Sequence, residues 1–250
     1  MDVTIQSPEM SGMNSAMDDK LFWAKYFKTY DILNEAIPYQ RLVEDFLESL
    51  NINEGDLILD AGSGTGNFCI RLKACGAIPI GFDFSEKALE IHRRKDSSAI
   101  TYLGDLTDRL PFPDDSFDKI ISNNVLYTIN KNLRLGVVQE CYRVLKPEGK
   151  MVIANVHTGF NPVIIFLDHL KETHRINGSL QTTKDFLRKG YFVAKMFYYS
   201  HCLIKRNNSG KYAFLEKYEQ RDLLKQAGFR EIADTVKTYS DQSYLDTGIK

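Results

Sequence analysis

Three glycines alternate with small polar residues directly after a short apolar run. The segment reads Leu57-Ile-Leu-Asp-Ala-Gly-Ser-Gly-Thr-Gly66, so Gly62, Gly64 and Gly66 lie between a predicted strand and a predicted helix. Glycine lets the chain turn sharply and lets a ligand approach the backbone, because no Cβ stands in the way. The N–H groups and the dipole at the start of the helix face this turn. The pattern predicts a ligand-binding loop that includes Ser63; the alternative is a tight turn that binds nothing.

Acidic residues follow the apolar runs around this loop. Asp60 directly precedes the glycines, where a carboxylate could hold a cationic group. Asp83 comes 23 residues later, after the second apolar run. An acid about 20 residues beyond such a turn pairs with ribose hydroxyls in doubly wound sheets; the alternative is a helix cap shared with Ser85. Asp105 and Leu106 follow the third run, where they could meet the amine and the ring face of an adenine, or form a surface turn.

Strand and helix patterns alternate through the middle of the chain and would position these residues. Apolar runs predict strands at 57–59, 78–82, 100–103, 119–121 and 151–154, and amphipathic stretches predict helices near 66–75, 85–94 and 131–145. Such alternation is typical of βαβ units, so we predict a doubly wound, Rossmann-like, mostly parallel α/β sheet. Helical patterns also precede it, at residues 21–30 and 42–50.

The chain divides into three parts. Residues 1–18 are polar and aperiodic, and we predict a mobile tail there. The ligand-binding domain is predicted to comprise 19–157 and 216–250. Its last helix, over 216–227, ends at Gly228, the residue type expected at a C-cap.

Residues 158–215 interrupt the alternation and form a predicted insertion. Helices are expected over about 162–175 and 182–189, followed by a Tyr- and Phe-rich stretch from Tyr191. The insertion has nine Lys or Arg residues against three Asp or Glu. We predict a lid with an apolar, aromatic pocket and a basic rim that includes Arg188. It would suit an aromatic or acyl substrate with an anionic group. The alternative is a packed subdomain with a solvated basic surface.

Five segments together resemble the successive motifs of class I S-adenosylmethionine-dependent methyltransferases. They occur in that family's order and spacing, at residues 58–66, 81–85, 104–105, 117–126 and 142–150. The closest resemblance is to the small-molecule group that includes quinone-ring and natural-product methyltransferases. The Gly-x-Gly-x-Gly spacing differs from the Gly-x-Gly-x-x-Gly of nicotinamide and flavin sites, which argues against a dehydrogenase.

The resemblance implies a particular sheet and a particular cofactor. The sheet would have seven strands, with Ser243–Ile249 as an antiparallel last strand; Glu231–Tyr239 is a further strand-like run near the end of the chain. S-adenosylmethionine would be the methyl donor and S-adenosylhomocysteine the product. Asp60, Gly62 and Gly64 would line the methionine part of the cofactor.

The other implied contacts are with the nucleoside part. Asp83 would bind both ribose hydroxyls, with Phe84 beside the adenine. Asp105 and Leu106 would hold the adenine, and Asn123 would contact the cofactor from the end of the fourth strand.

Candidate catalytic residues lie where the sheet meets the insertion. A sulfonium methyl is a good electrophile, so holding a nucleophile in line is the main task, and a base is needed only for a nucleophile whose proton has a high pKa. Tyr127 follows the fourth strand, and His157 follows the fifth and is the predicted general base; a structural or substrate-contacting His is the alternative. Tyr26 and Tyr30 either pack on the sheet or close over the cofactor, where an aromatic face suits a cation.

Composition narrows the function further. The net charge of −1 and the absence of an Asn-Pro-Pro-Tyr-like motif after the fourth strand argue against a DNA target. The four cysteines form no Cys-x-x-Cys pair, so neither a disulfide framework nor a metal site is expected. No signal peptide or membrane span is expected, and we predict a cytoplasmic enzyme with a small-molecule acceptor. An RNA-modifying methyltransferase and a catalytically silent scaffold remain alternatives, and the methylated atom and the oligomeric state stay open.

Overall fold

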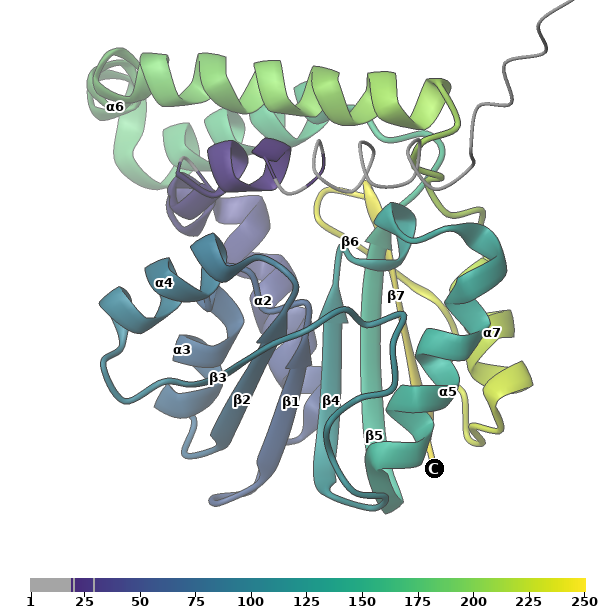
Figure 1. The fold of residues 1–250 in the computed structure, drawn as a ribbon. Helices are drawn as coiled ribbons and strands as arrows, with labels where there is room; N and C mark the ends of the chain where they lie inside the picture. Colours follow the sequence, from purple (N-terminus) through teal and green to yellow (C-terminus); the bar gives the residue numbers. More distant parts are fainter. Residues whose placement is uncertain (1–18, 20, 29) are drawn as a thin grey trace, which may run out of the picture.

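A seven-stranded sheet organises the chain in the computed structural model, which describes residues 19, 21–28 and 30–250 (Figure 1). The strand order is β3-β2-β1-β4-β5-β7-β6. The strands are β1 (Leu57–Ala61), β2 (Ile78–Asp83), β3 (Ile100–Leu103), β4 (Phe117–Asn123), β5 (Leu145–Val156), β6 (Val236–Thr238) and β7 (Ser243–Ile249). The first five are parallel and β7 is antiparallel to both its neighbours. This confirms the predicted Rossmann-like sheet and its antiparallel last strand.

Helices cover both faces of the sheet, because successive strand residues point to opposite sides. Ile121 and Val152 pack in a cluster with α2 and α3, whereas Ile120 and Ile153 pack in a cluster with α5 and α7. The helices are α2 (Ile37–Leu50), α3 (Asn67–Ala74), α4 (Glu86–Lys95), α5 (Arg134–Val144) and α7 (Glu219–Ala227), with 3₁₀ turns η1 (Asp31–Glu35), η2 (Leu126–Thr128) and η3 (Lys131–Leu133). Apolar runs that are continuous in sequence are therefore buried on both sides.

The insertion differs from its prediction. Helix α6 (Pro162–Asn208) is helical on both sides of a break at Gly178, where φ is 73° and ψ is 171°. The stretch from Tyr191, which the sequence does not predict as a helix, belongs to the second arm of α6. Figure 1 shows both arms of α6 lying across the carboxyl ends of the parallel strands. The aromatic residues there have high strand propensity, but burial of one helical face determines the local structure.

The N-terminal helical segment, residues 21–28, lies between α6 and the sheet (Figure 1). Trp23 is buried and donates its indole N–H to the Tyr212 hydroxyl at 3.1 Å, just beyond α6. The following η1 turn is tied to the glycine loop, because the Thr65 hydroxyl donates to Asp31 at 2.7 Å. The predicted tail, residues 1–18, lies outside the described residues.

Among the described residues, no helix is both long enough and apolar enough to span a membrane.

Candidate functional site

A cavity of about 420 Å³ lies between the carboxyl edge of the sheet and α6. This volume is within the range of small-molecule sites. The wall comes from the glycine loop after β1, the ends of β2, β4 and β5, the N-terminal helical segment and α6. The crevice at the carboxyl ends of the strands is where doubly wound sheets bind ligands.

The glycine loop is held in a conformation that only glycine tolerates. Gly62 has φ of 95°, and a Cβ at this position would overlap the side chain of Val125. Its N–H donates to the Phe82 carbonyl at 2.8 Å, which anchors the loop to β2. Gly64, with φ of 52°, donates its N–H to Asp83 at 2.9 Å. The backbone therefore lines the cavity with no side chain in between.

Asp83 is placed to accept hydrogen bonds from a ligand. One carboxylate oxygen accepts the Gly64 N–H and the other accepts the Ser85 N–H at 2.8 Å. Each oxygen keeps lone-pair capacity for a further donor, and the side chain lines the cavity. Burial raises the pKa of Asp83 to about 6, although the two N–H groups act in the opposite direction. The arrangement suits two neighbouring hydroxyl groups of a ligand.

Asp60 adds a second buried carboxylate to the same wall. It is 2% exposed, and the Cys69 thiol donates to it at 3.3 Å. Burial raises the pKa of Asp60 to about 7, the Cys69 hydrogen bond lowers it, and the charge of Asp83 raises it. No Lys or Arg belongs to the described cavity wall. Ionising both buried carboxylates is therefore unfavourable in the free chain, and a cationic ligand would stabilise their ionised forms.

Three polar atoms of residues in the wall lack hydrogen-bond partners within the described part of the chain. They are Oδ1 of Asn123, at the end of β4, Oγ of Ser63, in the glycine loop, and Nδ2 of Asn67, at the start of α3. Buried polar atoms without partners are rare in folded proteins and call for an explanation. With the glycine cradle and the two carboxylates, they fit a polar, cationic cofactor.

The structure brings most predicted site residues together. Those that line the cavity are Tyr30, Asp60, Gly62, Ser63, Gly64, Asp83, Phe84, Asp105, Leu106, Asn123 and Tyr127. Asp105 is exposed and accepts hydrogen bonds from the N–H and the hydroxyl of Thr107, whereas Leu106 is buried. Across the described residues, no group of three or more His, Cys, Asp or Glu side chains is arranged to hold a metal.

Two predicted site residues lie outside the cavity wall. A Cβ on Gly66 would overlap the buried ring of His92, so this glycine makes room for α4. His157 has both ring nitrogens engaged: Nδ1 accepts the Gly159 N–H at 2.9 Å, and Nε2 lies 2.7 Å from the Asp241 carbonyl. An Nδ1 acceptor and an Nε2 donor describe one fixed neutral tautomer. This geometry supports a structural role for His157 rather than the predicted general base.

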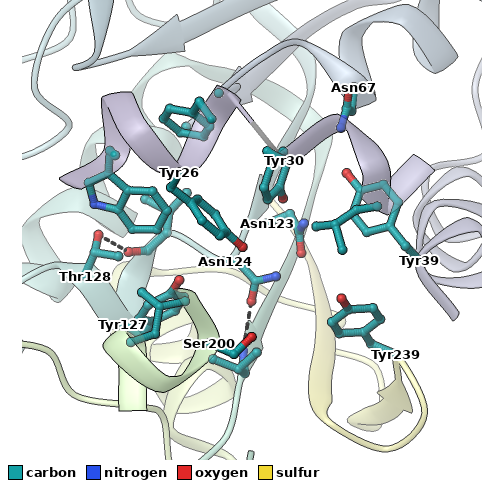
Figure 2. A pocket seen from close by; sticks show the side chains of 18 of the residues that line it. Tyr26, Tyr30, Tyr39, Asn67, Asn123, Asn124, Tyr127, Thr128, Ser200 and Tyr239 are labelled. Atoms are coloured by element: carbon teal, nitrogen blue, oxygen red, sulfur yellow. Dashed lines mark hydrogen bonds between the residues drawn. The ribbon is translucent and has the colours of Figure 1, made fainter. Parts of the chain in front are cut away.

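Sequence reasoning missed Tyr39 and Tyr239, which line the cavity together with the predicted Tyr26, Tyr30 and Tyr127. Figure 2 shows Tyr26, Tyr30, Tyr39, Tyr127 and Tyr239 around the cavity. Burial raises the pKa of all five, that of Tyr30 to about 12. They remain protonated at neutral pH and are hydrogen-bond donors. Tyr39 belongs to α2 and Tyr239 follows β6, so no local motif indicates these two residues.

The cavity face of α6 supplies the remaining, largely apolar part of the wall. Its lining residues recur at helical spacing, as Pro162, Ile165, Phe166 and His169 on the first arm and Val193, Met196, Phe197, Ser200 and Leu203 on the second. This spacing was the available signal for the longer helix.

The predicted basic rim is not part of the described cavity wall. Arg206 stacks over the Phe22 ring at 3.9 Å, and Lys211 pairs with Asp19 at 3.0 Å. The side chain of Arg188 lies outside the described part of the chain. The described Lys and Arg side chains therefore do not support the prediction that the substrate carries an anionic group.

Comparison with known proteins agrees with this geometry. The family profile described as "Methyltransferase domain" matches residues 59–153. A demethylmenaquinone methyltransferase of Shouchella clausii is 28% identical over 232 residues, covering 86% of this chain and 88% of the relative. The protein of the same name from Clavibacter sepedonicus is 40% identical over 118 residues, covering 44% of this chain and 45% of the relative.

Solved structures share the fold. A S-adenosylmethionine-dependent methyltransferase of Aquifex aeolicus superposes with a TM-score of 0.58 at 15% identity, covering 88% of this chain and 97% of that one. A protein of Methanococcus maripaludis, described as a putative methyltransferase of the same type, superposes with a TM-score of 0.58 at 18% identity. The match covers 100% of this chain and 97% of that one. At these identities the likeness concerns the fold alone.

Proposed function

Because this chain is a class I S-adenosylmethionine-dependent methyltransferase, we propose that it methylates a small, uncharged aromatic acceptor of the quinone type, held beneath α6. The observation that carries the proposal is the composition of the cavity wall. It is aromatic and apolar on the α6 side, it continues into the acid and glycine site, and its described part holds no Lys or Arg. The relatives named demethylmenaquinone methyltransferases support a quinone acceptor.

The polar half of the cavity would hold the cofactor, whose sulfonium supplies an electrophilic methyl group when bound. Asp83 would accept the ribose hydroxyls on the two oxygens that Gly64 and Ser85 orient. Asp60 would face the cationic methionine part. Oδ1 of Asn123 would gain the partner that it lacks within the described chain.

The adenine and the loop complete these contacts. Leu106 and Phe84 would pack against the adenine ring, with Asp105 near its amine. Gly62 and Ser63 would contribute backbone and hydroxyl groups on the methionine side. Gly66 is assigned no ligand contact, because its missing side chain makes room for His92.

Positioning would be the main work of the chain's own residues toward the acceptor. Phe166, Met196 and Phe197 offer apolar surface that excludes water from the ring. The tyrosine hydroxyls, kept protonated by burial, would donate to an oxygen of the acceptor rather than remove a proton. Holding a nucleophile in line can contribute roughly 7–11 kcal/mol to lowering a barrier. Tyr127 is thus proposed as an orienting donor.

An RNA acceptor is not better supported. Single-stranded nucleic acid is bound in grooves that combine cations with stacking aromatics. The described cavity wall has the aromatics but no Lys or Arg, so it lacks one half of that combination.

Calorimetric titration with S-adenosylmethionine and S-adenosylhomocysteine tests the cofactor half. We expect Asp83→Asn to weaken binding about 100-fold, because a neutral amide replaces an acceptor of two charge-assisted hydrogen bonds. Asp108→Asn is the matched control, since Asp108 is exposed and does not line the cavity. Equal affinities for the two variants would contradict the assignment of Asp83.

Methyl transfer to a panel of acceptors tests the other half. Uncharged quinols should be methylated with a higher kcat/KM than the same rings carrying a carboxylate. A preference for the carboxylated rings, with cofactor binding intact, would overturn the proposed acceptor class.

A further inference from the structure

The outward face of α6 carries an apolar stripe that the cavity does not explain. On the second arm, Leu187, Tyr191 and Tyr198 are 74%, 65% and 63% exposed. Their spacing of four and seven residues places them on one side of the helix. The residues that line the cavity lie on the other side of this arm. Leu187, Tyr191 and Tyr198 are called the outer stripe below.

The first arm has a similar outward face. Val163, Ile164 and Leu167 are all exposed and occupy one side of its first turns. Ile165 and Phe166, between them, turn into the cavity. Figure 1 shows the second arm as the outermost element above the sheet, so no other described element covers it. Exposed apolar groups gathered on one element mark an interaction site more often than scattered ones do.

Positive charge accompanies the outer stripe. Lys171 and Lys205 are exposed, and the Lys195 ammonium lies 4.6 Å from the centre of the Tyr191 ring. The two acids of α6 whose side chains the structure describes pair with another element. Asp168 lies 3.6 Å and Glu172 lies 2.6 Å from the guanidinium of Arg41 on α2. The described part of this surface therefore combines apolar and aromatic side chains with an excess of cations.

We propose that the outward face of α6 docks on an anionic phospholipid surface. A helix with Leu and Tyr on one side and Lys beside them lies in the plane of a bilayer interface. The aromatic rings lie at the headgroup level. Each Lys near an anionic leaflet adds to the attraction. The cavity lies directly beneath this face, so if the proposed function holds, an apolar acceptor dissolved in the bilayer would reach it from above.

Co-sedimentation of the full chain with vesicles tests this docking without reference to catalysis. We expect binding to vesicles of phosphatidylcholine with phosphatidylglycerol, weaker binding to phosphatidylcholine alone, and weakening by salt. The variant Leu187→Ser/Tyr198→Ser should bind the anionic vesicles at least about tenfold more weakly, because two exposed apolar anchors are lost.

The matched control removes two exposed apolar residues at the opposite edge of the sheet. Ile78 and Ile100 are 47% and 43% exposed at the amino ends of β2 and β3. Ile78→Ser/Ile100→Ser should bind vesicles as the unmodified chain does. Unchanged cofactor affinity in both double variants shows that each is folded.

Three outcomes would overturn the proposal. They are no binding of the unmodified chain to anionic vesicles, equal weakening in both double variants, or a dimer in solution that only Leu187→Ser/Tyr198→Ser dissociates. The last outcome would assign the stripe to a second copy of the chain. Methylation of a water-soluble quinol by the stripe variant keeps the proposed function separate, since that reaction needs no membrane.

Discussion

The two halves of the cavity are built by different means. On the sheet side, the ligand-facing groups are backbone amides and carboxylates at the ends of neighbouring strands, fixed by hydrogen bonds such as that from Gly64 to Asp83. On the α6 side, they are side chains on two helical arms, such as Phe166 and Met196. The first half depends on backbone geometry, and the second depends on which side chains the arms present.

This difference has a consequence for tolerance to substitution. A change in the glycine loop moves backbone that several contacts share, whereas a change on α6 alters one part of an apolar wall. We therefore expect that mutations can impair cofactor binding and acceptor binding separately.

The largest effect is expected from Gly62→Ala. Its φ of 95° is unfavourable for alanine, and the new Cβ would overlap Val125. Both the strain and the overlap lower the free energy of unfolding, together by roughly 2–4 kcal/mol. The loop would shift out of the cradle, and cofactor affinity should fall more than about 100-fold. Calorimetry and thermal unfolding measure the two effects.

Gly136→Ala provides the control for this change. Gly136 lies in α5 with open space where its Cβ would be. Alanine there should stabilise the helix by about 0.5–1 kcal/mol and leave cofactor binding unchanged. If Gly62→Ala also binds the cofactor normally, backbone geometry does not define this half.

The complementary change is Ser200→Phe on α6. Ser200 is 7% exposed and lines the cavity, as Figure 2 shows, so a phenyl ring would occupy space meant for the acceptor. We expect kcat/KM for the acceptor to fall about 30- to 100-fold, with cofactor affinity changed less than about twofold. His201→Phe, at the next and exposed residue, should leave both values unchanged. A parallel loss of cofactor affinity in Ser200→Phe would show that the halves are coupled.

The same contrast explains what the sequence could predict. The glycine loop, Asp60 and Asp83 belong to consecutive strand–turn units, so residue type and spacing are enough to identify them. Gly66 shares that pattern and yet makes room for His92, because a spacing rule does not distinguish a glycine that faces a ligand from one that faces a neighbouring helix.

The α6 half could be predicted only in outline. An insertion rich in aromatic residues is evident in the sequence, but the β-propensity of the stretch from Tyr191 conceals a helix that one buried face stabilises. Of the five tyrosines around the cavity, Tyr26, Tyr30 and Tyr127 are predicted near the site, whereas Tyr39 and Tyr239 reach it only through folding. His157 is expected at the site because it follows β5, but its hydrogen bonds to Gly159 and Asp241 hold it outside the cavity wall.

A smaller effect is expected from pH, and it should affect the cofactor half alone. Burial raises the pKa of Asp60 to about 7 and that of Asp83 to about 6 in the free chain. A cationic cofactor favours the ionised form, so protonation competes with binding as the pH falls. We expect the Kd for S-adenosylmethionine to rise about tenfold or more between pH 8 and pH 5.5. Calorimetry across this range measures it.

Asp60→Asn should flatten this pH dependence while weakening binding at pH 8, and Asp108→Asn should leave it unchanged. Protonation of Asp60 and Asp83 also makes the stability of the fold depend on pH. Because the folded chain holds these protons more tightly than the unfolded chain, its free energy of unfolding falls as the pH rises from about 4 through about 7. An affinity that is independent of pH in the unmodified chain would argue against cofactor contact by Asp60.

The smallest effect is expected at the break between the two arms of α6. Gly178, with φ of 73° and ψ of 171°, has a conformation that is essentially restricted to glycine, although nothing would contact its Cβ. Gly178→Ala should therefore introduce strain of about 1–3 kcal/mol at the turn without any overlap. We expect faster hydrogen exchange in α6, a KM for the acceptor raised a few-fold and an unchanged Kd for S-adenosylmethionine. Gly190→Ala, inside the second arm and in equally open space, is the control and should slow exchange there. If Gly178→Ala weakens cofactor binding as much as it raises the KM for the acceptor, the arms of α6 position the sheet side as well, and the cavity has one indivisible wall rather than two.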